Sequence, residues 1–303
     1  MAGRRVVSVA ISDGLGNQMF QYATGLAMAR RLGVPLRCHI KVFARSRGRP
    51  LGLKEFGLKL DRNWRPLAER LRLLRVDVTV PVIRDHAEFV PEVLTAAAPV
   101  RLEGWFQSWR YFDAIQEDLR RAFDFDQIRL GPPAEAMLGR IRAAVMPVAV
   151  HVRRGDYRNH PSAFPLLDRE HYARARTRLE SEIGPPSYFV FSDEPEVAAE
   201  LTADWPDRTL VSGFRATEDF RLMASCRHFF IANSTFSWWG AWLGRSPDKR
   251  VIAPRSGMAR VSAAGSMSTR GCHPIGSGSS QDQSAAKIGS CGYQSVPPEI
   301  GGT

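Results

Sequence analysis

The chain has 303 residues, of which 44% are hydrophobic and 24% are charged. This length and composition predict a globular protein, and the usual size of a domain favours two domains over one. The formal net charge of +11 comes mostly from short, scattered arginine groups, which attract nucleotide sugars, polyanions and anionic membranes alike. The sequence has no zinc-finger spacing, helix-turn-helix signal or RNP-like segment, so we do not expect a nucleic-acid partner.

The cysteines and the first residues indicate a cytoplasmic protein. The four cysteines lie far apart and form no Cys-x-x-Cys pair, which argues against a zinc site and a disulfide scaffold. The N-terminal residues pass directly into a short apolar strand, so we expect no signal peptide, and no apolar run is long enough to span a membrane. Peripheral association with the inner membrane stays open. We expect the sequon at Asn233 to be unmodified, because its surroundings look buried.

The first half of the chain opens with a strand, a glycine turn and a helix. We predict the strand over Val6–Ile11, the turn over Asp13–Asn17 and the helix over Gln18–Leu32. Residues 34–100 show little pattern apart from a strand at Val76–Val82. The further elements expected in this half are a strand and turn over Arg101–Trp109 and helices over Asp113–Phe123 and Ala134–Ala144.

Strands alternate with helices through the second half, which is typical of a parallel, doubly wound, Rossmann-like domain. We predict strands at Val145–Val150, Ser187–Phe191, Thr209–Val211, His228–Ala232 and Arg250–Ala253, with helices at Arg169–Ile183, Glu196–Thr202, Thr217–Cys226 and Trp238–Leu243. The expected domains are therefore residues 1–144 and 145–254. Residues 255–303 contain ten serines, nine glycines and one aromatic residue, and we expect this tail to be disordered.

An arginine pair follows the strand at Val145–Val150. Two planar cations at the carboxyl end of a buried strand predict a phosphate site, because ligands bind at this edge of open α/β sheets. Arg153 and Arg154 would both reach one ligand only if the chain turns at Gly155, since successive side chains on a strand point to opposite faces. His151 and Asp156 could orient the arginines, and a purely structural role for His151 stays equally open.

The glycine turn near the N-terminus is a weak nicotinamide signal. Gly14 and Gly16 are present, but Met19 stands where a dinucleotide fingerprint needs a third small residue. The turn would still let the backbone approach a ligand, with Asn17 and Gln18 placed to hydrogen-bond at the start of the helix. The alternative is a plain glycine turn with Asn17 as the helix cap.

Two other strand ends carry polar residues. The first is the segment Asn233, Ser234, Thr235, Phe236 and Ser237, which would present hydroxyls and backbone N–H groups to an anion. The tryptophans that follow, Trp238, Trp239 and Trp242, are expected in the core rather than as sugar platforms. The second is Ser192-Asp193, where a carboxylate could hold a ribose or a base, or serve as an ordinary helix cap.

Five segments together resemble the bacterial α-1,2-fucosyltransferases of glycosyltransferase family 11. They are Asp13–Tyr22, Gly104–Ser108, His151–Tyr157, Phe191–Asp193 and Asn233–Gly240, in the family's order, and the resemblance runs from about residue 5 to Pro254. It implies an α/β, GT-B-like fold with two Rossmann-like domains, GDP-fucose as donor and a galactoside hydroxyl as acceptor. It also implies inversion at the fucose anomeric carbon, an α-1,2 linkage and no metal or other cofactor.

The resemblance assigns roles to the motifs. Residues 145–254 would bind GDP-fucose and residues 1–144 would face the acceptor, a galactose-terminated glycan or glycolipid of bacterial polysaccharide biosynthesis. Arg153 and Arg154 would stabilise the leaving diphosphate, and Asp156, with Asp13 in reserve, would accept the proton of the acceptor hydroxyl. The predicted substrate-binding residues comprise Gly14, Gly16, Asn17, Gln18, His151, Ser192, Asp193 and the segment from Asn233 through Ser237.

Two alternatives stay open. The motifs indicate diphosphate binding more directly than fucose, so another metal-independent nucleotide-sugar transferase fits them as well. After Pro254 the family continues with a segment that completes the second domain, whereas this chain continues with the Ser/Gly-rich tail, which resembles a shifted reading frame. An inactive GDP-binding module is therefore the second alternative.

Overall fold

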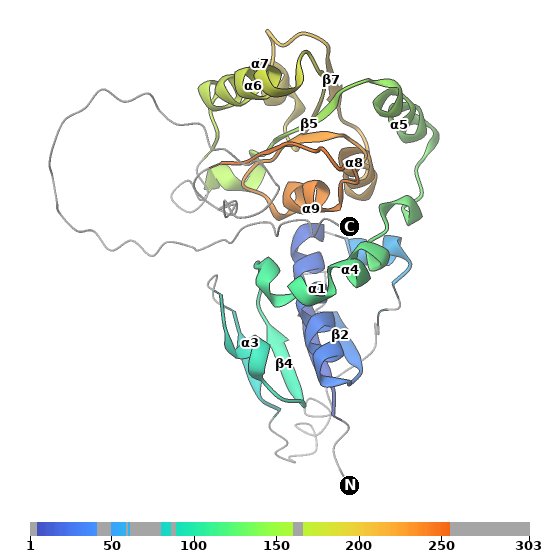
Figure 1. The fold of residues 1–303 in the computed structure, drawn as a ribbon, viewed down its shortest axis with the longest axis vertical. Helices are drawn as coiled ribbons and strands as arrows, with labels where there is room; N and C mark the ends of the chain where they lie inside the picture. The colour runs from blue at the N-terminus through green and yellow to red at the C-terminus, as the bar shows by residue number, and fades with distance from the viewer. Residues whose placement is uncertain are drawn as a thin grey trace, which may run out of the picture.

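The chain forms two parallel β-sheets that follow one another along the long axis of the molecule (Figure 1). The computed structural model describes residues 5–40, 50–58, 60, 80–85, 89–159 and 166–254, without the side chains of Asp156 and Asn159. The predicted strand at Val76–Val82 lies mostly outside these residues. The tail, residues 255–303, lies outside them entirely.

The first sheet has the strand order β2-β1-β4-β3, and every pairing in it is parallel. Its strands are β1 (Val7–Ile11), β2 (Leu36–Ile40), β3 (Val82–Arg84) and β4 (Val100–Glu103). The helices of this half are α1 (Leu15–Leu32), α3 (Glu92–Thr95), α4 (Gln116–Ala122) and the 3₁₀ turns η2 (Gly52–Phe56), η3 (Trp109–Tyr111), η4 (Asp113–Ile115) and η5 (Phe125–Gln127). Helix α1 packs on β1 and β2 of this sheet and on α9 of the second half of the molecule.

The second sheet has the order β7-β6-β5-β8-β9 and is also parallel throughout. Its strands are β5 (Pro147–Val152), β6 (Ser187–Ser192), β7 (Arg208–Val211), β8 (His228–Phe230) and β9 (Val251–Ile252). Its helices are α5 (Pro132–Ala143), α6 (Arg169–Ile183), α7 (Pro195–Leu201), α8 (Ala216–Ala224), α9 (Thr235–Leu243) and the 3₁₀ turn η6 (Gly155–Asn159). Strand β5 is buried along its whole length, as expected of a central strand with helices on both faces.

The two halves share one hydrophobic core, which is built where α1 meets α9. The Phe20 ring of α1 lies 4.8 Å from the ring of Trp238 and 5.0 Å from that of Trp239, centroid to centroid. Phe112 stacks on Trp239 at 5.4 Å. Trp238, Trp239 and Trp242 are each 2% exposed or less, which confirms that these tryptophans are core residues. Burial of several large aromatic side chains here holds the two sheets in a fixed relation.

Every element predicted in the second half is present, with ends that differ from the predicted ones by up to three residues, whereas the first half contains elements that were not predicted. Strand β5 continues through His151 and Val152, two residues beyond the predicted end. Helix α1 begins at Leu15 with Gly14 as its N-cap residue, so the interpretation of Asn17 as the helix cap is wrong. Strand β2 was not predicted, because four of its five residues are only partly buried and the pattern of an edge strand is weak.

Candidate active site

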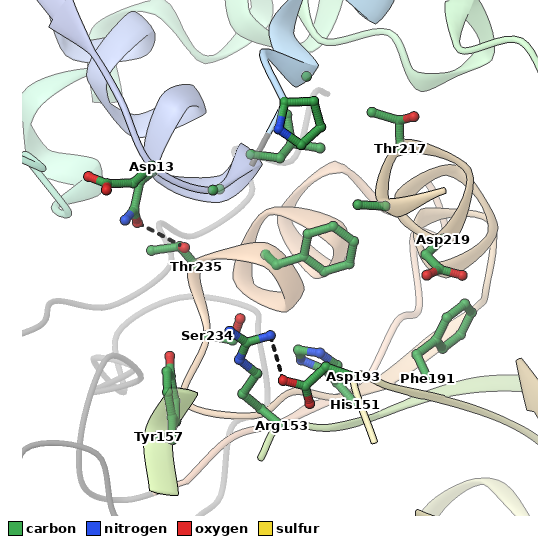
Figure 2. A pocket seen from close by; sticks show the side chains of 18 of the residues that line it. Asp13, His151, Arg153, Tyr157, Phe191, Asp193, Thr217, Asp219, Ser234 and Thr235 are labelled. Atoms are coloured by element: carbon green, nitrogen blue, oxygen red, sulfur yellow. Dashed lines mark hydrogen bonds and ion pairs between the residues drawn. The ribbon is translucent and has the colours of Figure 1, made fainter. Parts of the chain in front are cut away.

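A cavity of about 520 Å³ lies between the two halves of the molecule (Figure 2). Its floor is formed by the carboxyl ends of β5 and β6, and its walls by the first turns of α1, α8 and α9. The carboxyl edge of a parallel sheet is the usual ligand site of doubly wound folds. Of the residues predicted from the sequence, eleven line this cavity: Asp13, Gly14, Gly16, Asn17, His151, Arg153, Ser192, Asp193, Ser234, Thr235 and Phe236.

Arg153 is a positively charged residue on the floor of the cavity, directly after β5. Its Nη1 lies 2.8 Å from Oδ2 of Asp193, and both side chains are about three-quarters buried, with exposures of 21% and 25%. The guanidinium also lies over the ring of Tyr157, at 5.2 Å from its centroid. Asp193, the carboxylate expected to hold a ribose or a base, is thus an orienting partner of the arginine (Figure 2). Paired and stacked, Arg153 is held in place before a ligand arrives.

Arg154 lies differently from its neighbour. Its backbone N–H donates to Oδ1 of Asp193 at 3.0 Å, but it is not among the residues that line the cavity. Alternation along an extended backbone places adjacent side chains on opposite faces, and only one of the two arginines reaches the cavity here. Gly155 follows, where a Cβ would collide with the Asp193 carboxylate. The turn after β5 therefore organises the chain around Asp193.

His151 is a neutral side chain in this site. It is 6% exposed, and burial, with the Arg153 charge as the second cause, lowers the pKa of its imidazole to about 3. Its Nδ1 has no hydrogen-bond partner among the described residues. A neutral imidazole has one N–H and one lone pair, so it can donate or accept a hydrogen bond with a ligand, but it is too weak an acid to protonate a leaving group near neutral pH.

The first turn of α9 forms the part of the cavity wall that lies beside α1. Ser234, Thr235 and Phe236 line the cavity, whereas Asn233 and Ser237 are buried beneath it. The free backbone N–H groups of a helix's first turn attract anions. Because α9 begins at Thr235, this turn and Arg153 can bind the same anionic group.

Helix α1 is tied to α9 through Asn17. Its Oδ1 accepts hydrogen bonds from Thr235 Oγ1 at 3.0 Å and from Gln107 Nε2 at 2.7 Å. Gln18, also predicted as a ligand contact, is fully buried and does not line the cavity. Its amide donates to the carbonyls of Asp13 and Pro50 at 2.7 and 2.9 Å, so it fixes the loop.

Gly16 lies at the contact between α1 and α9. A Cβ there would stand 2.5 Å from the carbonyl carbon of Thr235 and 2.6 Å from the nitrogen of Phe236. We therefore expect Gly16→Ala to separate the two helices and lower the free energy of unfolding by about 1–3 kcal/mol. Urea denaturation measures this change.

Gly139 provides the matched control, because it lies exposed in α5 and a Cβ there would meet nothing within 4 Å. Gly139→Ala should raise the free energy of unfolding by up to about 1 kcal/mol through helix propensity. Equal effects of the two alanines would contradict the close approach of α1 to α9.

Asp13 and Trp105 line the side of the cavity that belongs to the first sheet. The indole Nε1 of Trp105 donates to Asp13 Oδ2 at 3.0 Å, and Ser12 Oγ donates to the same oxygen at 3.0 Å. Trp105 is 39% exposed, which is unusual for so large an aromatic side chain. An exposed indole beside a carboxylate offers a sugar both a flat apolar surface and a hydrogen-bond acceptor.

Several lining residues were absent from the predicted site. They include Trp105, Gln107, Tyr157, Thr217 and Asp219. Trp105 and Gln107 belong to the segment Gly104–Ser108, which carries the family resemblance, so a signal for them existed in the sequence. Thr217 and Asp219 lie on α8, whose sequence shows only an amphipathic helix. Of the predicted residues, Asp156 has a side chain that lies outside the described residues.

The sequence profile of "Glycosyl transferase family 11" matches residues 94–259 of the chain, more than half of its length. The chain belongs to glycosyltransferase family 11. The matched region begins before β4 and contains the arginine turn after β5, the loop after β6 and all of α9. It therefore covers the whole floor of the cavity and the α9 wall.

Curated relatives of this family 11 chain include two proteins from Escherichia coli. It is 27% identical to the O-antigen biosynthesis glycosyltransferase WbnK over 82% of this chain and 94% of the relative. It is 28% identical to an alpha-1,2-colitosyltransferase over 82% of this chain and 91% of the relative. A rabbit (Oryctolagus cuniculus) galactoside alpha-(1,2)-fucosyltransferase 2 is 29% identical over 76% of this chain and 64% of the relative.

The fold of the family 11 chain is similar to that of NodZ alpha-1,6-fucosyltransferase. The structure of NodZ with GDP superposes with a TM-score of 0.52 at 16% identity, covering 82% of this chain and 94% of NodZ. The structure soaked with GDP-fucose gives 0.51 with the same coverage. The predicted GT-B-like fold with two Rossmann-like halves is confirmed.

No helix in the described part of the chain has the length and apolar character needed to cross a membrane.

Proposed function

We propose that the chain transfers L-fucose from GDP-fucose to the 2-hydroxyl of a galactoside, with inversion at the fucose anomeric carbon. The observation that carries this proposal is the single cavity in which Arg153 and the first turn of α9 face Asp13 and Trp105. The first pair would bind the diphosphate and the second the sugar, in one cavity between the two sheets. We propose residues 145–254 as the donor half and residues 1–144 as the acceptor half.

The donor side would bind the diphosphate and stabilise it as it leaves. Charge builds on the diphosphate as the bond to fucose breaks, and fixed donors aimed at that charge lower the barrier. Arg153, held by Asp193, would supply guanidinium N–H groups. Ser234 would add its hydroxyl and Thr235 its backbone N–H, because the Ser234 N–H and the Thr235 hydroxyl already donate within the protein. His151 stays neutral, so it can contact the nucleotide without adding charge.

The acceptor side would place and activate the galactoside. We propose that the apolar face of galactose packs against Trp105 and that Asp13 accepts the proton of the attacking hydroxyl. Inversion requires the hydroxyl to attack from the side opposite the leaving diphosphate. Asp13 lines the cavity from the turn between β1 and α1, across from the floor that carries Arg153 (Figure 2). Asp156 remains the other candidate for this base.

Colitose is a second candidate for the transferred sugar. The chain is 28% identical to an alpha-1,2-colitosyltransferase over 91% of that protein, and 29% identical to the rabbit fucosyltransferase over only 64% of it. The similarity to WbnK supports a role in bacterial O-antigen synthesis. Incubation with GDP-fucose and GDP-colitose, each with a panel of galactose-terminated acceptors, tests the proposal. We expect transfer from GDP-fucose at the higher kcat/KM, and a preference for GDP-colitose would reassign the donor.

The same assay addresses an inactive binding module. Binding of GDP measured by calorimetry, alongside turnover, distinguishes the two cases. The cavity and its orienting contacts lie wholly within the described residues before Arg255, and we expect turnover as well as binding. GDP binding without transfer to any acceptor would favour the inactive module.

Activity should survive chelation of divalent metals. The one Asp-x-Asp triplet of the sequence, Asp124-Phe-Asp126, is engaged by Arg245, whose nitrogens lie 2.6 Å from an oxygen of each carboxylate. Neither aspartate lines the cavity, so Arg153 and the α9 turn are left to balance the diphosphate charge. Assays in excess EDTA should retain at least about half of the turnover, an estimate that allows for weak metal effects on the nucleotide itself. Loss in EDTA with recovery on adding manganese would overturn the metal-free mechanism.

A further inference from the structure

Asp219 is a carboxylate in the cavity that the mechanism does not use. It lies on α8 and lines the cavity, and its Oδ1 is buried without a hydrogen-bond partner among the described residues. Leaving a buried acceptor unpaired is costly, so such atoms commonly await a ligand or have a functional role. The neighbouring Glu218 differs, because its carboxylate accepts from the backbone nitrogens of Gly131 at 2.8 Å and Arg215 at 2.9 Å.

The surroundings of Asp219 favour a neutral hydrogen-bond donor. Burial, with the charge of Glu218 as the second cause, raises the pKa of Asp219 to about 7. The aromatic side chain of Phe191 lies beside it in Figure 2. A phosphate would be repelled here, whereas a flat ring with N–H groups could lie against the aromatic side chain and donate to the carboxylate.

The position of Asp219 relative to Arg153 suggests how a nucleotide would lie. Figure 2 shows Asp219 and Thr217 on one side of the cavity and Arg153 and Ser234 on the other, with His151 and Asp193 between them. A diphosphate bound at Arg153 would therefore extend its nucleoside along the ends of β5 and β6 toward α8. The far end of that nucleoside is the base.

We propose that Asp219 selects guanine in the donor by accepting hydrogen bonds from its N1–H and its 2-amino group. A carboxylate offers two adjacent acceptors, and guanine presents two adjacent donors on one edge. Adenine presents one donor beside an acceptor on the equivalent edge, and uracil presents a single N–H between two carbonyl oxygens. This inference rests on the proposed function, since it assumes a nucleoside diphosphate donor.

Binding of five nucleoside diphosphates tests the assignment. Calorimetry at pH 8 would compare GDP, IDP, XDP, ADP and UDP on the wild type and on Asp219→Asn. Inosine lacks the 2-amino group and xanthine carries a carbonyl in its place. We expect the wild type to bind GDP about 10- to 100-fold more tightly than IDP or XDP, the range for a good bidentate contact to a base. The asparagine amide offers one acceptor and one donor, so Asp219→Asn should prefer XDP to GDP by about tenfold or more.

Asp113→Asn is the matched control, because Asp113 is exposed and does not line the cavity; it should leave all five affinities unchanged. Equal weakening of GDP, IDP and XDP in Asp219→Asn would overturn the assignment. Equal affinities of the wild type for GDP and IDP would also overturn the assignment. This comparison uses only the wild-type protein, so it does not depend on the folding of a variant. If the wild type binds GDP, ADP and UDP equally, base selection by Asp219 fails while the diphosphate site stands. If it binds none of them, the proposed function fails as well.

Discussion

Asp13→Asn should lower kcat by about 10²- to 10³-fold, within the range for loss of a general base. The amide has nearly the same shape but cannot accept the proton of the acceptor hydroxyl. Asp13 has a φ of 66°, a conformation that asparagine tolerates well, so the backbone should not change. Donor affinity should stay within about twofold, because the diphosphate would bind on the other side of the cavity. Steady-state kinetics with saturating GDP-fucose, and calorimetry with GDP, measure the two effects.

Ser12→Ala is the control for this prediction. It removes one hydrogen bond to Asp13 Oδ2, of 3.0 Å, and leaves the bond from Trp105 and the carboxylate itself. We expect a loss in kcat of about tenfold or less, in keeping with one hydrogen bond. An Asp13→Asn enzyme with more than half of the wild-type kcat would show that the base lies elsewhere, with Asp156 the next residue to replace.

Arg153→Lys should reduce turnover by about 10- to 1,000-fold, the effect of losing one fixed donor to a developing charge. Lysine keeps the positive charge but lacks the planar fork that pairs with a diphosphate and with Asp193 at the same time. Because the loss arises mainly as the diphosphate leaves, kcat should fall more than GDP affinity. Transfer assays and GDP calorimetry on the same preparation separate the two.

Arg154→Lys provides the matched comparison, since it makes the same substitution at the adjacent position. Arg154 does not line the cavity, and its contact to Asp193 is made through the backbone N–H, which lysine retains. We expect its turnover to stay within about threefold of the wild type, as for most substitutions away from the reacting groups. If the two lysine variants lose turnover equally, the separation of the two arginines across the strand is wrong.

The residues at the carboxyl end of β5 could be predicted from the sequence, because a buried strand and the turn after it are visible in a short stretch of sequence. The run before His151 reads as a buried strand, and alternation along an extended chain already implied that Arg153 and Arg154 reach one ligand only through a turn at Gly155. Of these two arginines, only Arg153 lines the cavity in the structure. It also shows why Gly155 is needed, since any side chain there would meet Asp193.

The remaining parts of the site depend on contacts between distant segments. Gln18 looked like a ligand residue, but its amide bonds to Pro50 and Gly52, more than thirty residues away. Asp219 was not predicted as a site residue, since in the sequence it is only one of two adjacent acids on a predicted helix. Only packing shows that Glu218 is engaged at Gly131 while Asp219 Oδ1 stays unpaired. Such tertiary effects leave little trace in periodicity or local motifs.

The most direct test of the proposed reaction is the structure of its product. The wild-type enzyme would be incubated with GDP-fucose and a galactose-terminated acceptor in EDTA, and the purified product examined by NMR for the linkage and the anomeric configuration of the new fucose. We predict fucose on the 2-hydroxyl of galactose, with the anomeric configuration opposite to that in the donor. Fucose on another hydroxyl, or fucose that keeps the donor's configuration, would contradict the proposed arrangement of Asp13, Trp105 and Arg153.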